Sequence, residues 1–195
     1  ARSLGDGERT PFTTVQSLET GARYRGREGI TASVAAFRTT LSDDVVFDET
    51  TARNEPVPAT ERIGAVADFV AEPAPWFTSA LGATYTRATF SESGGRYTDG
   101  ELVPFVPQVI VRSDLAVRPV LGRVLDRTLR AHAGLGMTAL HRRPIPYGEL
   151  GTDVFVADFN AGVRLQEVEI ELDIFNLLDA EWNDGEFVYA SNFER

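Results

Sequence analysis

VEIELDIFNLLD, residues 168–179, is the stretch of sequence that decides the fold. Its side chains alternate in character: the apolar row consists of Val168, Ile170, Leu172 and Ile174, and the polar row of Glu169, Glu171 and Asp173. Because successive side chains of a β-strand point to opposite faces, the pattern predicts a strand with one apolar and one solvated face. The apolar face requires either a protein core or lipid to cover it.

Composition narrows the class of protein. The chain has 195 residues, 43% of them hydrophobic, so it is long enough for one domain with a sizeable core or for a piece of a larger one. Its net charge of -10 argues against a nucleic-acid partner, because a phosphate-binding surface should be basic. The sequence has no cysteine, which excludes disulfides, zinc–thiolate sites and a thiol nucleophile. It also has no run of about 18 uncharged apolar residues, but a transmembrane barrel needs only alternating segments of about ten.

Alternation recurs along most of the chain. Seven further segments predict strands, over residues 15–26, 30–40, 60–71, 76–86, 108–117, 129–140 and 154–165. With the opening stretch, and with the second strand resuming over 43–49, about nine long strands are expected. Residues 120–129, VLGRVLDRTL, also admit a helical turn. The predicted fold class is all-β.

The connections between these strands alternate in length. Short ones fall near residues 26–29, 72–75 and 165–167, with a medium one near 118–124. Long polar ones fall near 50–59, 91–107, 143–152 and 179–186. This order predicts an antiparallel up-and-down meander with short turns at one end and long loops at the other, which is typical of bacterial outer-membrane β-barrels. A soluble sandwich or lipocalin-like barrel would also alternate, with less reason to sort its loops.

Charged residues occupy the polar rows, and we expect them to line a water-filled lumen while the apolar rows face lipid. The lumen-facing set consists of Glu19, Arg23, Arg62, Asp68, Arg112, Asp114, Arg130, Asp158, Arg164, Glu169, Glu171 and Asp173. Arg164 and Glu169 flank a tight turn and are predicted to lie close together, as an exposed pair worth about 0.2–1 kcal/mol. Carboxylates on alternate residues are about 6.6–7 Å apart along a strand, so a solvated row is favoured over a hydrolase pair or metal site. For His132, on the same row, a lumen position is favoured over a ligand or acid–base role.

Several short motifs occur in a characteristic order. They are Glu19-Thr20-Gly21-Ala22-Arg23, Arg62-Ile63-Gly64, Tyr97-Thr98-Asp99-Gly100 with Val106-Pro107, and Asn176-Leu177-Leu178-Asp179 with Trp182 shortly after. In this order and spacing the chain resembles the TonB-dependent outer-membrane receptors, whose barrels carry an Asn-Leu-Phe/Leu-Asp signature near their end. The resemblance implies that residues 1–195 are a partial C-terminal region of a 22-stranded transmembrane β-barrel. Neither the plug domain nor a final strand after Phe193-Glu194-Arg195 is in the sequence, so we expect the chain to be part of a larger outer-membrane protein.

The resemblance also implies a function. The parent protein would sit in the bacterial outer membrane and take up a scarce solute of the siderophore, cobalamin or glycan class, without catalysis and without a metal or other cofactor. Its partners would be outer-membrane lipid, the remainder of the barrel and plug, TonB through the missing N-terminal part, and the solute, but no nucleic acid. The expected solute contacts are the loop residues Arg53, Arg96, Tyr97, Tyr147 and Trp182, because Arg, Tyr and Trp dominate recognition surfaces. A passive or structural outer-membrane barrel and a soluble β-barrel ligand-binding protein are the alternatives.

Overall fold

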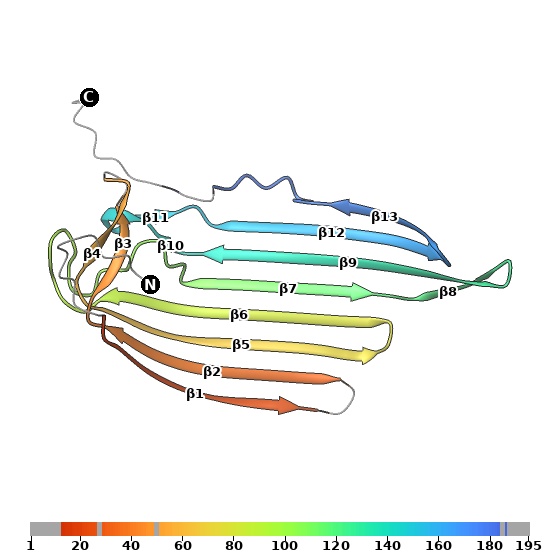
Figure 1. The fold of residues 1–195 in the computed structure, drawn as a ribbon, viewed down its shortest axis with the longest axis horizontal. Coiled ribbons are helices and arrows are strands. Elements are labelled where there is room, and N and C mark those ends of the chain that lie inside the picture. The colour runs from red at the N-terminus through yellow and green to blue at the C-terminus, as the bar shows by residue number, and fades with distance from the viewer. Residues whose placement is uncertain (1–12, 27–28, 49–50, 184–185, 187–195) are drawn as a thin grey trace, which may run out of the picture.

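The computed structural model describes residues 13–26, 29–48, 51–183 and 186, and these are built almost entirely of β-strands (Figure 1). The long strands are β1 (Val15–Arg25), β2 (Ile30–Leu41), β5 (Thr60–Ala74), β6 (Phe77–Phe90), β7 (Val109–Val117), β9 (Arg127–His141), β12 (Val154–Leu165) and β13 (Val168–Ile174). The short elements are β3 (Asp44–Asp48), β4 (Arg53–Val57), β8 (Val120–Val124), β10 (Arg143–Pro144), the 3-10 helix η1 (Pro146–Gly148) and β11 (Leu150–Gly151). The predicted all-β class is confirmed.

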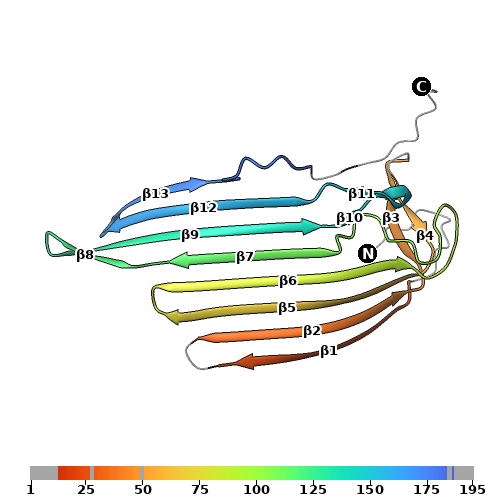
Figure 2. The ribbon, with the colours of Figure 1, turned by 180° about the vertical axis from the view of Figure 1, so that it is seen from behind.

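The long strands form one antiparallel sheet in the order β1-β2-β5-β6-β7-β9-β12-β13, which β8 joins by pairing with β9. Each long strand pairs with the next long strand of the chain, as an up-and-down meander requires. β1 and β13 lie at opposite sides of the sheet in both views (Figures 1 and 2). In the part of the chain that the structure describes, these two strands are the ends of the strand order.

The connections sort to the two ends of the sheet, as predicted. The turns β1–β2, β5–β6, β8–β9 and β12–β13 lie at one end, here called the short-turn end (Figure 1). The long connections 42–59, 91–108 and 142–153 gather at the other, the loop end (Figures 1 and 2). The β12–β13 turn has only two residues, with Gln166 at φ 55°, and it brings the opening stretch directly beside β12.

Three local predictions are corrected at the loop end. Residues 44–48 do not continue β2; they form β3, which pairs with β4 in a separate hairpin. β4 itself lies in the segment that was expected to be a long polar connection, near residues 50–59. Pro56 is tolerated there because the hairpin has only two strands, so that a missing ladder donor costs little. The connection 142–153 likewise contains the short pair β10–β11 and η1.

Two further local predictions are corrected at the short-turn end. Residues 120–129 form β8 and the start of β9, so the helical alternative is wrong. Leu125 and Asp126 adopt φ angles of 50° and 59°, which close a hairpin between the two strands. Residues 72–74, expected to be part of a turn, extend β5 to Ala74 after a shift of register.

The register of the ladders separates the two predicted rows onto two faces. One face, called the polar face, carries all twelve charged residues that were expected to line a lumen; Asp114, Gly136 and Asp158 form one of its cross-strand rows. The other, the apolar face, carries rows such as Val34, Ala67, Ala83, Val111 and Ala139. The structure thus confirms the alternation, while the medium that each face meets stays a prediction.

Glycines on the polar face give room to larger neighbours. A Cβ atom on Gly64 would lie 2.5 Å from Phe37 Cζ, and one on Gly162 would lie 2.5 Å from His132 Cε1. The Phe37 and His132 side chains therefore lie across the neighbouring strand, which a side chain at either glycine would prevent.

The apolar face of the main sheet is not covered by a second layer within the described residues. Side chains of the apolar face are consequently open: Ile170 is 68% exposed and Leu172 55%. No helix in the described part of the chain is long and apolar enough to cross a membrane.

Candidate functional site

The loop end contains a packed hydrophobic core. The buried cluster consists of Val46, Val57, Ala88, Phe90 and Val103, with Tyr97 and Val106 packed against it. Its members come from the β3–β4 hairpin, the end of β6 and the connection after β6. The rings of Phe90 and Tyr97 are stacked, with centroids 4.3 Å apart. We call the β3–β4 hairpin together with residues 91–107 the cap.

Asp44 of β3 fixes the cap to the polar face. Its Oδ2 accepts a hydrogen bond from Thr60 Oγ1 at 2.9 Å and another from Arg62 Nη2 at 2.6 Å. Thr60 is fully buried, and Arg62 belongs to the polar face of β5. Because a buried hydroxyl and a half-buried guanidinium both depend on this carboxylate, the hairpin is held over the loop end of the polar face.

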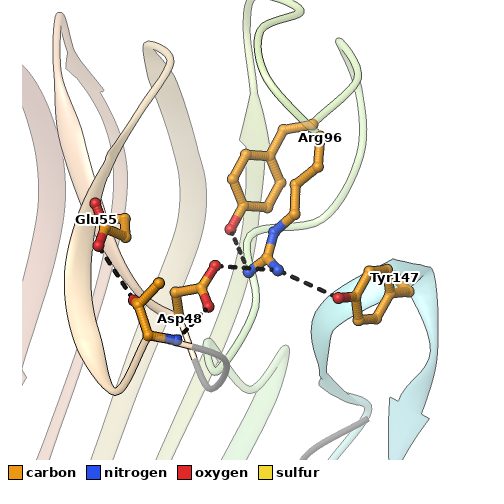
Figure 3. A network of polar contacts seen from close by, with 6 residues as sticks. Asp48, Glu55, Arg96 and Tyr147 are labelled. Atoms are coloured by element: carbon orange, nitrogen blue, oxygen red, sulfur yellow. Dashed lines mark hydrogen bonds and ion pairs between the residues drawn. The ribbon is translucent and has the colours of Figure 1, made fainter. Parts of the chain in front are cut away.

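Arg96 joins three of the long connections (Figure 3). Its Nη1 lies 3.3 Å from Asp48 Oδ2 and 3.5 Å from the Tyr147 hydroxyl, and its Nη2 donates to the Tyr97 hydroxyl at 3.0 Å. The guanidinium carbon also lies 5.1 Å and 5.3 Å from the ring centroids of Tyr97 and Tyr147, within the range of cation–π attraction. These four residues are called the Arg96 cluster.

Local geometry supports the cluster on both sides. The Asp48 carboxylate accepts from the Thr51 amide at 3.2 Å, and the Thr51 hydroxyl donates to Glu55 at 3.1 Å, which ties the β3–β4 turn together (Figure 3). Tyr147 has a φ of 68°, a left-handed conformation that is unfavourable for an aromatic residue. This strained backbone places its ring beside Arg96, and half of the Tyr147 surface remains exposed.

Three of the five predicted solute-contacting residues therefore meet in one place: Arg96, Tyr97 and Tyr147. Arg53 lies on β4 opposite Asp48 in the register of the hairpin, at the edge of the same cap. Trp182 lies elsewhere, against β9 and β12. The sequence identified the residue types but not Asp48, whose role as the acidic partner depends on an unpredicted hairpin.

Trp182 borders a small apolar hollow of about 250 Å³ on the loop half of the polar face. Its floor comes from β9 and β12, and its lining consists of Thr138, Leu140, Arg143, Val154, Val156, Trp182 and Asn183. Arg143 Nη1 donates to the carbonyl oxygens of Thr152 and Asn183, each at 3.2 Å. The segment after β13 thus returns over the sheet toward the loop end.

Two carboxylates accept hydrogen bonds at the loop end, one belonging to the segment after β13 and one to the connection before β12. Glu186 Oε2 accepts from the Thr152 amide at 2.7 Å; hydrogen bonds from Thr152 are the main reason that the pKa of Glu186 is lowered. Asp153 lies 2.6 Å from His141 Nδ1 and also accepts from the Arg142 amide. The hydrogen bond with His141 is the largest cause of the lowered pKa of Asp153.

At the short-turn end of the polar face, Arg164 Nη2 lies 2.6 Å from Glu169 Oε2, which confirms the predicted pair. His132 reaches across Gly162 toward β13, and its Nε2 lies 3.5 Å from Glu171 Oε1 and its Nδ1 4.0 Å from Glu169 Oε1. The polar-row position of His132 follows from the alternation of the sequence, but its contacts with Glu169 and Glu171 do not, because β12 lies between β9 and β13. The remaining predicted lumen residues are distributed over the polar face and do not converge.

The motif Asn176-Leu177-Leu178-Asp179 ends β13. The Asn176 amide donates to Asp158 Oδ1 at 2.8 Å, and the Leu177 amide donates to the Ala157 carbonyl oxygen at 2.6 Å. The Asn176 side chain both donates to the carbonyl and accepts from the amide of Ala180. Asn176 and Asp179 have φ angles of 51°, which turn the chain out of the strand. The motif therefore terminates the strand by satisfying its backbone groups.

The arrangement offers hydrogen bonding, stacking and charge at the loop end. No group of three or more His, Asp or Glu side chains within the described residues is placed to hold a metal ion. Comparison with known proteins finds no match: no family model, no curated protein and no solved structure matches the chain.

Proposed function

We propose that this sheet is part of the wall of a bacterial outer-membrane β-barrel, with its apolar face toward lipid and its polar face toward the lumen. The single observation that carries the proposal is an uncharged band on the apolar face. At the loop end the band is bounded by Arg38 and Arg87, and at the short-turn end by Arg127. Between these limits the apolar face has no charged side chain in the described residues.

The band has the height that a bilayer requires. On β9 it runs from Leu129 to Ala139 and on β12 from Phe155 to Leu165, about 11 residues each. A membrane-spanning β-strand needs about 9–11 residues when tilted. A soluble protein would have to cover a band of this size with a second layer, because large exposed apolar surfaces are rare in soluble monomers.

The barrel so formed is best interpreted as a TonB-dependent receptor that takes up a scarce solute of the siderophore, cobalamin or glycan class. The motif order from residue 19 to Trp182 supports the family. The cap supports selective capture over passive flow, because it is a packed structure fixed over the polar face through Asp44 and Arg62. The Arg96 cluster would contact the solute, and the lumen charges would guide it.

Uptake in cells carrying or lacking the parent gene tests the proposal. We expect growth on a limiting solute of one of these classes to require the gene and to stop when the proton motive force is collapsed. Uptake that requires the gene but survives the collapse would identify a passive barrel. Recovery of the protein as a detergent-free monomer outside the membrane fraction would refute the barrel and favour a soluble ligand-binding protein.

A further inference from the structure

The β8–β9 hairpin projects from the short-turn end beyond the neighbouring turns (Figures 1 and 2). β12 pairs with β9 only as far as Leu129. β6 begins at Phe77, which pairs with Val117 of β7, and Val117 in turn pairs with Ala133 of β9. Neither β12 nor β6 extends alongside the residues between Leu129 and the tip of the hairpin. Residues 121–128 therefore form a ribbon of two strands with both faces open. Such a ribbon is at best marginally stable alone in water, so we expect it to be stabilised by contact with another surface.

The side chains of this ribbon are apolar where water would favour polar ones. Leu121 is 56% exposed, and Leu125, at the tip, is 88% exposed. Leu125 also occupies a left-handed position of the turn, at φ 50°, where Asn or Gly would be relaxed. Leu125 is strained and exposed, so it does not stabilise the hairpin through contacts within the chain. An exposed apolar side chain of this kind indicates contact with an apolar medium outside the chain.

Arginines surround these apolar side chains. Residues 117–130 contain Arg118, Arg123, Arg127 and Arg130 against one acidic residue, Asp126, in a chain whose net charge is -10. Within the described residues none of the four forms an ion pair; Arg123 Nη2 donates only to the Asp126 carbonyl oxygen, at 3.2 Å. The positive charge of the hairpin is thus without an anionic partner in this part of the chain.

We infer that the β8–β9 hairpin docks on the anionic phospholipid headgroups of the leaflet at the short-turn end, with Leu121 and Leu125 inserted and Arg123 and Arg127 at the lipid phosphates. Apolar tips flanked by arginine are the composition of interfacial anchors, because insertion and phosphate attraction add. A ribbon that continues a strand tilted by about 45° rises only about 9 Å over four residues, comparable with the headgroup layer. The inference rests on the proposed membrane location of the sheet.

The 195 residues contain no cysteine, so single labels can be placed in this chain once any cysteine elsewhere in the complete barrel has been replaced. An environment-sensitive fluorophore is attached at Val124→Cys in the hairpin, which pairs with Arg127 on the apolar side, at Leu172→Cys on the apolar face, or at Gln166→Cys in the β12–β13 turn. The proteins are placed in nanodiscs of phosphatidylcholine with or without phosphatidylglycerol, and quenching by spin-labelled lipid is measured. We expect quenching at 172 and 124 but little at 166, and stronger quenching at 124 when phosphatidylglycerol is present.

Two variants separate docking from a structural role. Arg123→Gln with Arg127→Gln should reduce quenching at 124 in phosphatidylglycerol to its level in phosphatidylcholine. Leu125→Asn should weaken quenching at 124 yet raise resistance to denaturant in detergent, because it relieves the left-handed strain of the turn. If Leu125 had only a structural role, the two measurements would not change in opposite directions. Quenching at 172 without quenching at 124 overturns the hairpin inference alone. Absence of quenching at 172 overturns the membrane location itself.

Discussion

Leu172→Arg distinguishes lipid from water on the apolar face. Leu172 pairs with Ala161, one residue from the centre of the band that runs from Phe155 to Leu165 on β12. An arginine on the lipid side of a barrel at the bilayer midplane costs about 2–4 kcal/mol. In water the same position is 55% exposed, and an exposed substitution of this kind changes stability by only about 0.5 kcal/mol.

The measurement is the free energy of unfolding in lipid vesicles, taken from reversible denaturant titration of the complete barrel. The expected loss corresponds to a shift of roughly 30- to 700-fold in the folding equilibrium, at about 1.4 kcal/mol per tenfold. Asn160→Arg is the matched control: it adds the same charge one residue from Ala161 but on the polar face, opposite Asp173. It should cost little in either medium.

Equal effects of Leu172→Arg and Asn160→Arg in vesicles would refute the assignment of the two faces. A cost near zero at Leu172 with a large cost at Asn160 would show that the faces are reversed.

Three further predictions concern the loop end and the polar face. Arg96→Gln should speed backbone hydrogen exchange in residues 91–107 and around Tyr147 while leaving exchange in the sheet unchanged, because each exposed cation–π contact is worth about 0.5–1 kcal/mol. Unchanged exchange in both loops would show that the Arg96 cluster does not hold them together. Gly162→Ala should lower the free energy of unfolding by about 1–3 kcal/mol in denaturant titration, because the added Cβ would lie 2.8 Å from a backbone oxygen of β13. Gly136→Ala is the control: the nearest atom to its added Cβ would be 3.4 Å away, so its effect should be nearly neutral. The contribution of the Glu186 carboxylate is fully present above its ordinary pKa near 4.5 and is lost as pH falls through its lowered folded pKa. Tryptophan fluorescence of the segment after β13, in a chain whose other tryptophan is replaced by Phe, should follow this loss, and Glu186→Gln should abolish it.

The sheet could be predicted from the sequence because its physics is local and repetitive. Alternation at positions such as Leu172 and Glu171 fixes which face each residue joins, and the turn after Leu165 fixes the register of Arg164 with Glu169. The strand number and the sorting of loops follow from the same pattern.

The cap could not be predicted because its determinants are nonlocal. Asp44 looks like a solvated strand end until β3 folds back onto Thr60, and Pro56 looks like a strand breaker until its strand proves to be an edge. Candidate residues such as Arg96 could be selected by type, but their convergence depends on three connections whose paths alternation does not determine. The β8–β9 hairpin was obscured by Leu125, a residue that seldom occupies a left-handed turn.

The core of the cap draws all its members from residues 46–106, whereas the ladders of the sheet join strands along the whole described chain. Its contacts therefore close over shorter stretches of chain than the ladders of the sheet do. Because Ala88 and Phe90 belong to β6, and Asp44 is held by Thr60 and Arg62 of β5, the same core also fixes the loop ends of these two strands. We expect the cap and the adjoining ends of β5 and β6 to keep their hydrogen-exchange protection in conditions where the rest of the sheet has lost its own.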